Sequence, residues 1–245
     1  MFRENSACVF YFNTADDGIL KKAGKAVGLK DRFGESGKWK AHNAICIQNF
    51  KEPIKLKTGY YGIPLKDSLY KITPEVEALA VPTIMTIAFS FKITAPLTQN
   101  DHYIVTNKES SRGVSISKTS LNILGSDGKL ELLYNYRDWN TVLIQYSLVT
   151  KSGGDQCIFQ LNDRRGFFKL GDFKRDIKHE LFIGGHPEKR NFANVILGNF
   201  EIYSGIFDEI DPPHYLVPDG IIRELQGDMD RRIYLNNNDT TMISL

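Results

Sequence analysis

Cysteine is scarce in this sequence of 245 residues: only Cys8, Cys46 and Cys157 are present, and no two of them form a Cys-x-x-Cys pair. Disulfide scaffolds and structural zinc sites need more cysteines at closer spacing. We therefore expect three free thiols that pack as small hydrophobic side chains.

Long apolar runs are also absent. No segment approaches the roughly 18 apolar residues of a membrane-spanning helix, and residues 1–5 lack the apolar run of a secretion signal. The sequence accordingly predicts no membrane span. We expect synthesis in the cytoplasm and retention in a reducing compartment, or release by lysis, with a virion or another large assembly as the final location.

The motifs of several enzyme classes are missing as well. There is no Gly-x-Ser-x-Gly nucleophile elbow, no phosphate-binding P-loop and no dinucleotide-binding glycine fingerprint. The five histidines are not at metal-ligand spacing, and we expect surface or structural roles for them; they are His42, His102, His179, His186 and His214. A catalytic triad assembled from distant residues is neither shown nor excluded by sequence. We predict no catalytic residue, no metal ligand and no cofactor.

The charge of the chain is small in total but uneven along its length. The formal net charge is +2 at pH 7. Residues 16–57 carry ten lysines and arginines against five acidic residues, a balance of +5, whereas residues 208–245 carry three arginines against eight acidic residues, a balance of −5. Oppositely charged segments attract each other within one molecule or between neighbouring copies. A solvated surface without a partner explains the pattern equally well.

What the sequence does contain is a series of short apolar segments separated by glycine turns. In residues 85–94 large apolar side chains alternate with small or polar ones, which is the period-two pattern of a half-buried strand. Residues 121–124 and 130–133 flank a Gly-Ser-Asp-Gly turn, and residues 142–148 and 157–161 flank a Ser-Gly-Gly turn. Both pairs predict β-hairpins. The predicted fold class is all-β, an antiparallel β-sandwich of the jelly-roll type.

The patterns divide the chain into three regions. Residues 1–59 are predicted as an N-terminal extension that contributes strands at 8–12 and 44–47. Its basic part, between Gly18 and Gly28, is expected to form a short helix. Residues 60–207 are predicted as the sandwich.

Residues 208–245 are predicted as a C-terminal appendage with a short helix and a tail. Asp219 can cap the helix. Its apolar residues follow helical spacing and are Ile221, Ile222, Leu225 and Met229. We expect this stripe to dock on the protein's own body or, alternatively, in a groove of a partner.

Six segments between residues 60 and 207 carry a family resemblance. They are Tyr61-Gly62-Ile63-Pro64, Thr86-Ile87-Ala88-Phe89-Ser90-Phe91, Trp139-Asn140-Thr141-Val142, Phe159-Gln160-Leu161-Asn162, Leu181-Phe182-Ile183-Gly184-Gly185 and Leu197-Gly198-Asn199-Phe200-Glu201-Ile202-Tyr203. In their order and spacing the chain resembles the concanavalin A-like lectin and glucanase jelly roll, and within it the laminin-G and pentraxin-like modules. Trp139 and the phenylalanines supply large inward surfaces, and Gly184-Gly185 permits a sharp turn.

The resemblance implies two chemistries that the residues can be tested against. The glucanase branch needs Glu-x-Asp-x-x-Glu on a strand, and the nearest match, Glu209-Ile210-Asp211-Pro212-Pro213-His214, lacks the last glutamate and contains two prolines that a central strand excludes. Calcium needs several converging oxygens, which Asn100-Asp101 and Asn162-Asp163 can supply. Turn chemistry explains these residues equally well, and Arg164-Arg165 would repel the ion. Calcium is therefore kept as an alternative only.

Two loops have the composition of a sugar-binding site, with aromatic rings beside Asn, Asp or Arg side chains. The candidate ligand-binding residues are Tyr134, Tyr136, Asp138, Trp139, Asp163, Arg164 and Arg165. A core position for Trp139 is the competing interpretation. Nucleic acid is not expected as a partner, because the basic extension has only Phe33 and Trp39 as stacking aromatics.

The missing catalytic motifs and the oppositely charged ends together favour a non-enzymatic structural or assembly protein. We expect a component of a phage or virus particle, such as a decoration, capsid or tail surface protein, whose partners are other subunits or copies of itself. The alternative is a glycan-binding lectin-like module. An unrecognised glycoside hydrolase is the second alternative.

Overall fold

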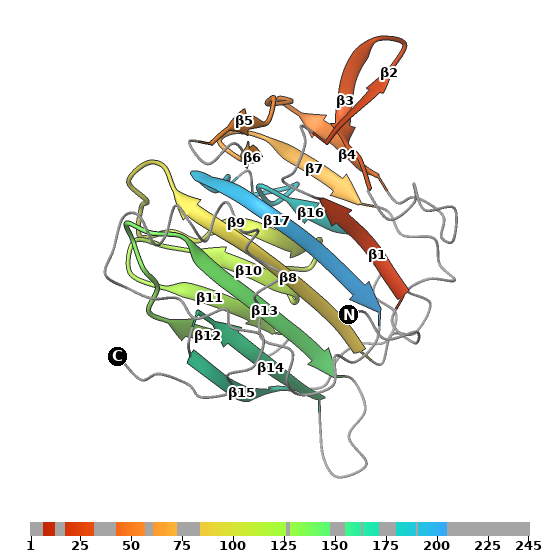
Figure 1. The fold of residues 1–245 in the computed structure, drawn as a ribbon. Helices are drawn as coiled ribbons and strands as arrows, with labels where there is room; N and C mark the ends of the chain where they lie inside the picture. The colour runs from red at the N-terminus through yellow and green to blue at the C-terminus, as the bar shows by residue number, and fades with distance from the viewer. Residues whose placement is uncertain are drawn as a thin grey trace, which may run out of the picture.

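Two antiparallel β-sheets packed face to face form the fold (Figure 1). The computed structural model describes residues 7–12, 18–31, 43–56, 61–72, 84–125, 128–147, 155–162, 164–171, 180–189 and 191–204. Within these ranges every regular element is a strand. The same ranges contain no helix that is long and apolar enough to cross a membrane. The predicted all-β sandwich is confirmed, whereas the helix expected after Asp219 lies outside the described residues.

The first sheet has eight strands, seven of them in the order β15-β14-β13-β8-β17-β6-β5. The eighth, β1, lies on the same side of β17 as β6 and pairs with the later residues of β17. Its strands are β1 (Ala7–Phe12), β5 (Ile54–Lys55), β6 (Tyr61–Pro64), β8 (Ile84–Ile93), β13 (Asn140–Ser147), β14 (Asp155–Leu161), β15 (Arg164–Gly171) and β17 (Val195–Ser204). The hairpin predicted around the Ser-Gly-Gly turn is the β13–β14 pair.

The second sheet has nine strands in the order β12-β11-β10-β9-β16-β7-β4-β3-β2. Its strands are β2 (Ile19–Lys22), β3 (Lys25–Leu29), β4 (Ala44–Gln48), β7 (Leu69–Ile72), β9 (His102–Asn107), β10 (Gly113–Ile116), β11 (Leu121–Gly125), β12 (Gly128–Leu132) and β16 (Leu181–Ile183). The hairpin predicted around the Gly-Ser-Asp-Gly turn is the β11–β12 pair. Strands from the first 59 residues thus extend both sheets.

The helix expected between Gly18 and Gly28 was wrong, because this segment is the β2–β3 hairpin. Ala23 and Gly24 form its turn with φ angles of 50° and 77°, the left-handed pair that a tight hairpin turn requires. Gly28 of β3 pairs with Ile45 of β4, which adds the hairpin to the edge of the second sheet. Strand pairing to β4 therefore decided the local structure.

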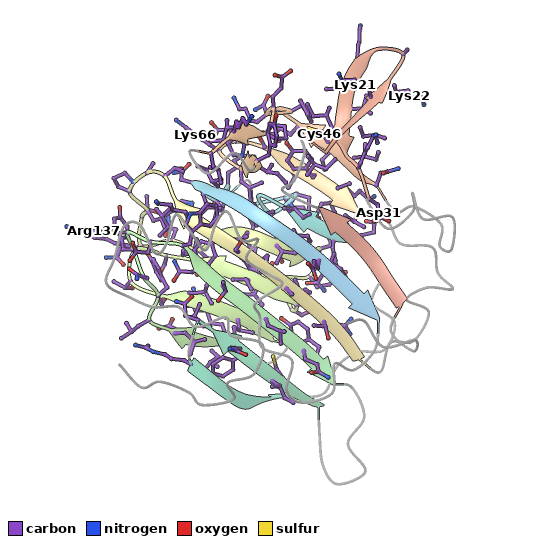
Figure 2. All side chains as sticks on the ribbon, in the orientation of Figure 1. Lys21, Lys22, Asp31, Cys46, Lys66 and Arg137 are labelled. Carbon is purple, nitrogen blue, oxygen red and sulfur yellow. The ribbon has the colours of Figure 1, made fainter. Side chains whose placement is uncertain are left out.

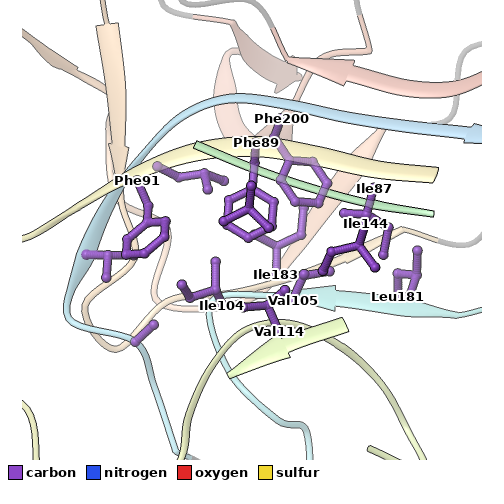
Figure 3. Packing of buried hydrophobic residues seen from close by; sticks show 14 of the residues in the cluster. Ile87, Phe89, Phe91, Ile104, Val105, Val114, Ile144, Leu181, Ile183 and Phe200 are labelled. Atoms are coloured by element: carbon purple, nitrogen blue, oxygen red, sulfur yellow. The ribbon is translucent and has the colours of Figure 1, made fainter. Parts of the chain in front are cut away.

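Aromatic and branched side chains fill the space between the sheets (Figure 3). Phe89 lies between Phe91 and Phe200, with ring centroids 6.0 and 5.8 Å away. The facing sheet contributes aliphatic side chains, among them Val114 and Ile183. Burying each such side chain stabilises the fold by roughly 1.5–3 kcal/mol. The inward row predicted for residues 85–94 is therefore the centre of the core.

The opposite face of β8 is also covered, which the alternation did not predict. Thr86, Ala88 and Ser90 are buried, and so is Glu201 of the neighbouring strand β17, which pairs with Ala88. Small outward side chains allow other parts of a chain to pack closely against a sheet. β8 is thus buried on both faces over residues 86–90.

Gly184 turns the chain sharply after β16, as predicted. Its φ is 97°, and a Cβ atom there would collide with the carbonyl oxygen of Ser68. Its amide donates to the carbonyl of Ile104 at 2.8 Å. Only glycine can adopt this positive φ and also lie so close to the Ser68 carbonyl without strain.

Candidate functional site

The two loops predicted to bind ligand meet at one end of the first sheet. Residues 133–139 connect β12 to β13, and Asn162 lies in the turn that connects β14 to β15. Asn162 Nδ2 donates to Asn140 Oδ1 at 3.1 Å, and Asn162 Oδ1 accepts the Thr141 amide at 2.8 Å. These bonds hold the two connections together. Arg164 begins β15 opposite Leu161, at the same end of the sheet.

Asn140 also fixes the shape of the 133–139 loop. Its buried side chain accepts the Asn135 amide at 2.8 Å and donates to the carbonyls of Asn135 at 2.7 Å and Asp138 at 3.1 Å. Side-chain amides of this kind satisfy backbone groups that no strand pairs with. The loop therefore has a defined conformation although it is not part of a sheet.

Tyr134 holds the loop at its other end. Its hydroxyl lies 2.9 Å from the Ser117 carbonyl and 3.3 Å from the Lys118 carbonyl, in position to donate to either. Burial, with a contribution from the nearby Tyr136, raises the pKa of Tyr134 to about 12. The hydroxyl thus remains a protonated donor at physiological pH, and the residue supports the loop.

Tyr136, rather than Trp139, is the ring that this loop presents to solvent. Tyr136 is 44% exposed, whereas Trp139 is only 2% exposed and packs in the interior. Arg137 is exposed next to Tyr136, and Figure 2 shows it at the margin of the molecule. Arg164 is exposed as well. The described part of the rim thus offers one aromatic face and two guanidinium groups.

The other residues predicted to bind a ligand or a partner contribute less to this rim or lie outside the described residues. Asp138 is half-buried, and its carbonyl accepts from Asn140. Arg165 pairs with Gln160 through the β14–β15 ladder. Asp163 lies outside the described residues, as do the predicted docking residues Ile221, Ile222, Leu225 and Met229 and the 209–214 segment that was compared with glucanases.

Two of the residues considered for calcium, Asp101 and Asn162, have other partners here, and Asp163 lies outside the described residues. Asp101 accepts from Lys129 Nζ at 3.2 Å and from Asn122 Nδ2 at 2.6 Å. Asn162 is used between β13 and β14, as described above. Across the described ranges, no three His, Cys, Asp or Glu side chains gather closely enough to hold a metal ion.

Sequence reasoning assigned a helix to part of the N-terminal basic region and counted the region's net charge, but it missed the surface that the region forms. Lys21, Lys22 and Lys25 are exposed on the β2–β3 hairpin, and Ile45 and Ile47 are exposed on the adjoining strand β4. Alternation of isoleucine with Cys46 and Gln48 was a usable signal for a strand, but it could not show which face meets solvent.

No family model and no curated protein matches the chain. Solved structures do match in fold. The botulinum neurotoxin type G receptor-binding domain is 12% identical with a TM-score of 0.52. The botulinum neurotoxin DC binding domain in complex with SialylT is 13% identical with a TM-score of 0.55, and the same domain in complex with rat synaptotagmin II is 12% identical with a TM-score of 0.54.

Each of these matches covers 82% of this chain but only 48% or 49% of the neurotoxin domain. The chain therefore spans about half the length of the structures that it resembles. At such low identity the likeness shows the fold alone, an all-β sandwich.

Proposed function

We propose that the chain is a non-catalytic recognition module that binds a glycan on the rim formed by Tyr136, Arg137 and Arg164. The carrying observation is the rigid presentation of this rim, which the bond between Asn140 and Asn162 holds in place. An exposed aromatic face can stack on the apolar face of a sugar, and guanidinium groups donate several hydrogen bonds to hydroxyl or carboxylate oxygens. A preordered loop loses little entropy when it binds.

The comparisons support this proposal at the level of fold. The neurotoxin structures are described as binding domains, one in complex with SialylT and another with synaptotagmin II. A further similar structure comes from botulinum neurotoxin type C, whose cell entry is dependent upon interaction with two ganglioside molecules. We also propose that the sandwich is of the concanavalin A-like, laminin-G type. The absence of catalytic activity is likewise part of the proposal.

A glycan array probed with the full chain, with and without calcium, tests the proposal. For the best-binding glycan we expect Tyr136→Ala and Arg164→Ala each to weaken binding about tenfold, which corresponds to losing one good stacking or charged contact. Lys118→Ala, an exposed substitution in a neighbouring loop, is the matched control and should bind normally. An array without hits in either condition, or unchanged binding by both rim variants, would contradict it.

A second candidate is the assembly role, in which the sandwich is a subunit of a phage or virus particle. The observation that favours it is the exposed basic and apolar surface around β2, β3 and β4, which differs from the glycan rim in position and chemistry. Self-association measured by light scattering tests this role. A chain that stays monomeric at high concentration and low salt would count against it.

A further inference from the structure

The β2–β3 hairpin carries three cations that have no carboxylate partner among the residues that the structure describes. It forms the free edge of the second sheet and extends beyond the rest of it (Figure 1). Lys21, Lys22 and Lys25 are exposed there, and Figure 2 shows Lys21 and Lys22 on the hairpin. None of the ion pairs found in the described ranges includes any of the three. The hairpin thus presents uncompensated positive charge.

The placement of two of these lysines costs stability in the isolated chain. Lys22 and Lys25 are directly opposite each other on either side of the turn. Like charges in that position repel each other and destabilise a strand pair. An anionic group bound between them would remove this repulsion.

An apolar strip lies next to the lysines. Ile45 and Ile47 of β4 are 44% and 49% exposed, while Cys46 between them is half-buried. Ile45 pairs directly with Gly28 of β3, so the strip begins beside the base of the hairpin. We call Lys22, Lys25, Ile45 and Ile47 together the basic isoleucine surface; Lys21, which precedes Lys22 in β2, points to the opposite face of the strand.

The composition of the basic isoleucine surface selects its partner. Exposed isoleucines gain free energy when another apolar surface covers them, and the lysines favour a partner that carries carboxylates. Lysines on an edge strand also discourage a second copy of the same edge from pairing with it. The complementary partner is therefore an acidic segment that has apolar residues of its own.

Residues 208–245 of this chain have that composition. Eight acidic residues against three arginines give a charge of −5. Ile221, Leu225 and Met229 recur at helical spacing, and Glu224 and Asp228 each precede one of them by a single position. On a helix these carboxylates would flank the apolar stripe.

We propose that the 208–245 segment of one copy docks on the basic isoleucine surface of a second copy. The apolar stripe covers Ile45 and Ile47, and Glu224 and Asp228 pair with the lysines of the hairpin. The docking site and the docking segment are different parts of the chain, so repetition of the contact builds a ring or an open array. This inference rests on the assembly role proposed above and is independent of glycan binding.

Sedimentation velocity of the full chain at low and high salt tests the contact. We expect concentration-dependent association that weakens with salt, because exposed charges are screened. Lys22→Glu/Lys25→Glu should weaken association about tenfold or more, and Ile45→Thr/Ile47→Thr, which keeps the β-branched shape, should weaken it at all salt concentrations. Lys108→Glu/Lys118→Glu makes the same charge change at exposed lysines elsewhere and should associate normally.

Mixing charge-reversed variants identifies the docking segment. Lys22→Glu/Lys25→Glu and Glu224→Lys/Asp228→Lys should each associate poorly alone, whereas their mixture should associate again, with each variant confirmed as folded by its thermal melt. A monomer under all conditions overturns both the contact and the assembly role. Association that neither charge variant changes overturns the contact alone. A monomeric chain that binds phosphatidylserine vesicles through Lys22 and Lys25 overturns the contact and assigns the surface to lipid.

Discussion

Asn140 and Asn162 supply hydrogen bonds to backbone groups at the rim that no neighbouring strand reaches. Asn162 does so with a φ of 55°, in the left-handed region that asparagine tolerates better than most residues. Asn140 is buried and uses both ends of its side-chain amide. The conformation of the candidate site thus depends on two asparagines that are not among its proposed contact residues.

His186 forms a second polar centre, in the connection between β16 and β17. Its Nδ1 accepts the amides of Glu188 and Lys189, both at 3.1 Å, so the proton must lie on Nε2, which donates to the Lys108 carbonyl at 3.0 Å. Burial is the main cause that lowers its pKa, and the nearby Lys189 adds to it, whereas the Lys108 carbonyl, Glu188 and Glu109 act in the opposite direction. The neutral ring is therefore part of the folded structure.

We predict that this histidine makes the fold less stable in mild acid. Its pKa is lower in the folded chain than the unfolded value of about 6.5, so the unfolded state binds more protons and stability falls as the pH drops below about 6.5. The limiting slope for one group is about 1.4 kcal/mol per pH unit. Urea unfolding of the wild type and of His186→Asn between pH 7.5 and 5.5 measures the effect.

The asparagine variant keeps an acceptor for the Glu188 and Lys189 amides but cannot titrate. Its stability should therefore depend less on pH than that of the wild type over this range. Two parallel stability profiles would show that protonation of His186 does not contribute.

At the level of elements, strands with strong alternation or a glycine turn were predictable. β8 was expected from its period-two pattern, and the β11–β12 and β13–β14 hairpins were expected from the turns between their strands. In each case the signal is local, because side-chain alternation and turn geometry belong to a few consecutive residues. Burial of the outer face of β8 left no such signal.

The candidate site was predictable in composition but not in geometry. The loop sequence indicated that Tyr136 and Arg164 belonged to one kind of surface, yet their placement at one end of the sheet depends on the β13–β14 register. Exposure of Tyr136 and burial of Trp139 depend in turn on the loop conformation that Asn140 sets. Contacts between residues far apart in sequence cannot be read from local patterns.

The β2–β3 hairpin was missed because its turn has an unusual residue. Ala23 is held at a φ of 50°, where an ordinary residue pays roughly 1–2 kcal/mol. Tight hairpin turns prefer Asn-Gly, which is the sequence signal that was absent. Pairing of β3 with β4 supports the turn in spite of this cost.

We predict that Ala23→Asn stabilises this hairpin by about 0.5–1 kcal/mol, because asparagine relieves part of the left-handed strain. Amide hydrogen exchange in β2 and β3 should slow by about two- to fivefold, since the hairpin opens locally. Gly24→Ala is the matched opposite: its Cβ would meet no atom within 4 Å, so its cost is the φ of 77° alone. Equal exchange in all three proteins would contradict the turn geometry.

For the whole molecule, the hydroxyl group of Tyr146 forms a hydrogen-bonded link between the two layers of the sandwich. Tyr146 of β13 points from the first sheet to the second, where its oxygen accepts the Gly113 amide at 2.8 Å and lies 3.1 Å from the Leu124 carbonyl. Burial raises the pKa of this phenol well above its usual value, so it stays neutral. Apolar packing holds the sheets together, and this group adds hydrogen bonds between them.

We predict that Tyr146→Phe lowers the free energy of unfolding by about 1–3 kcal/mol, because it leaves the buried Gly113 amide without its acceptor while the ring still fills the core. Urea unfolding measures the loss, with an unchanged denaturant slope as evidence that the folded state keeps its compactness. Tyr134→Phe makes the same chemical change at the half-buried rim, where water can replace the lost hydroxyl, and should cost at most about 1 kcal/mol. If the two variants lose equal stability, the hydroxyl of Tyr146 is not a special link between the sheets, and side-chain packing alone sets their position.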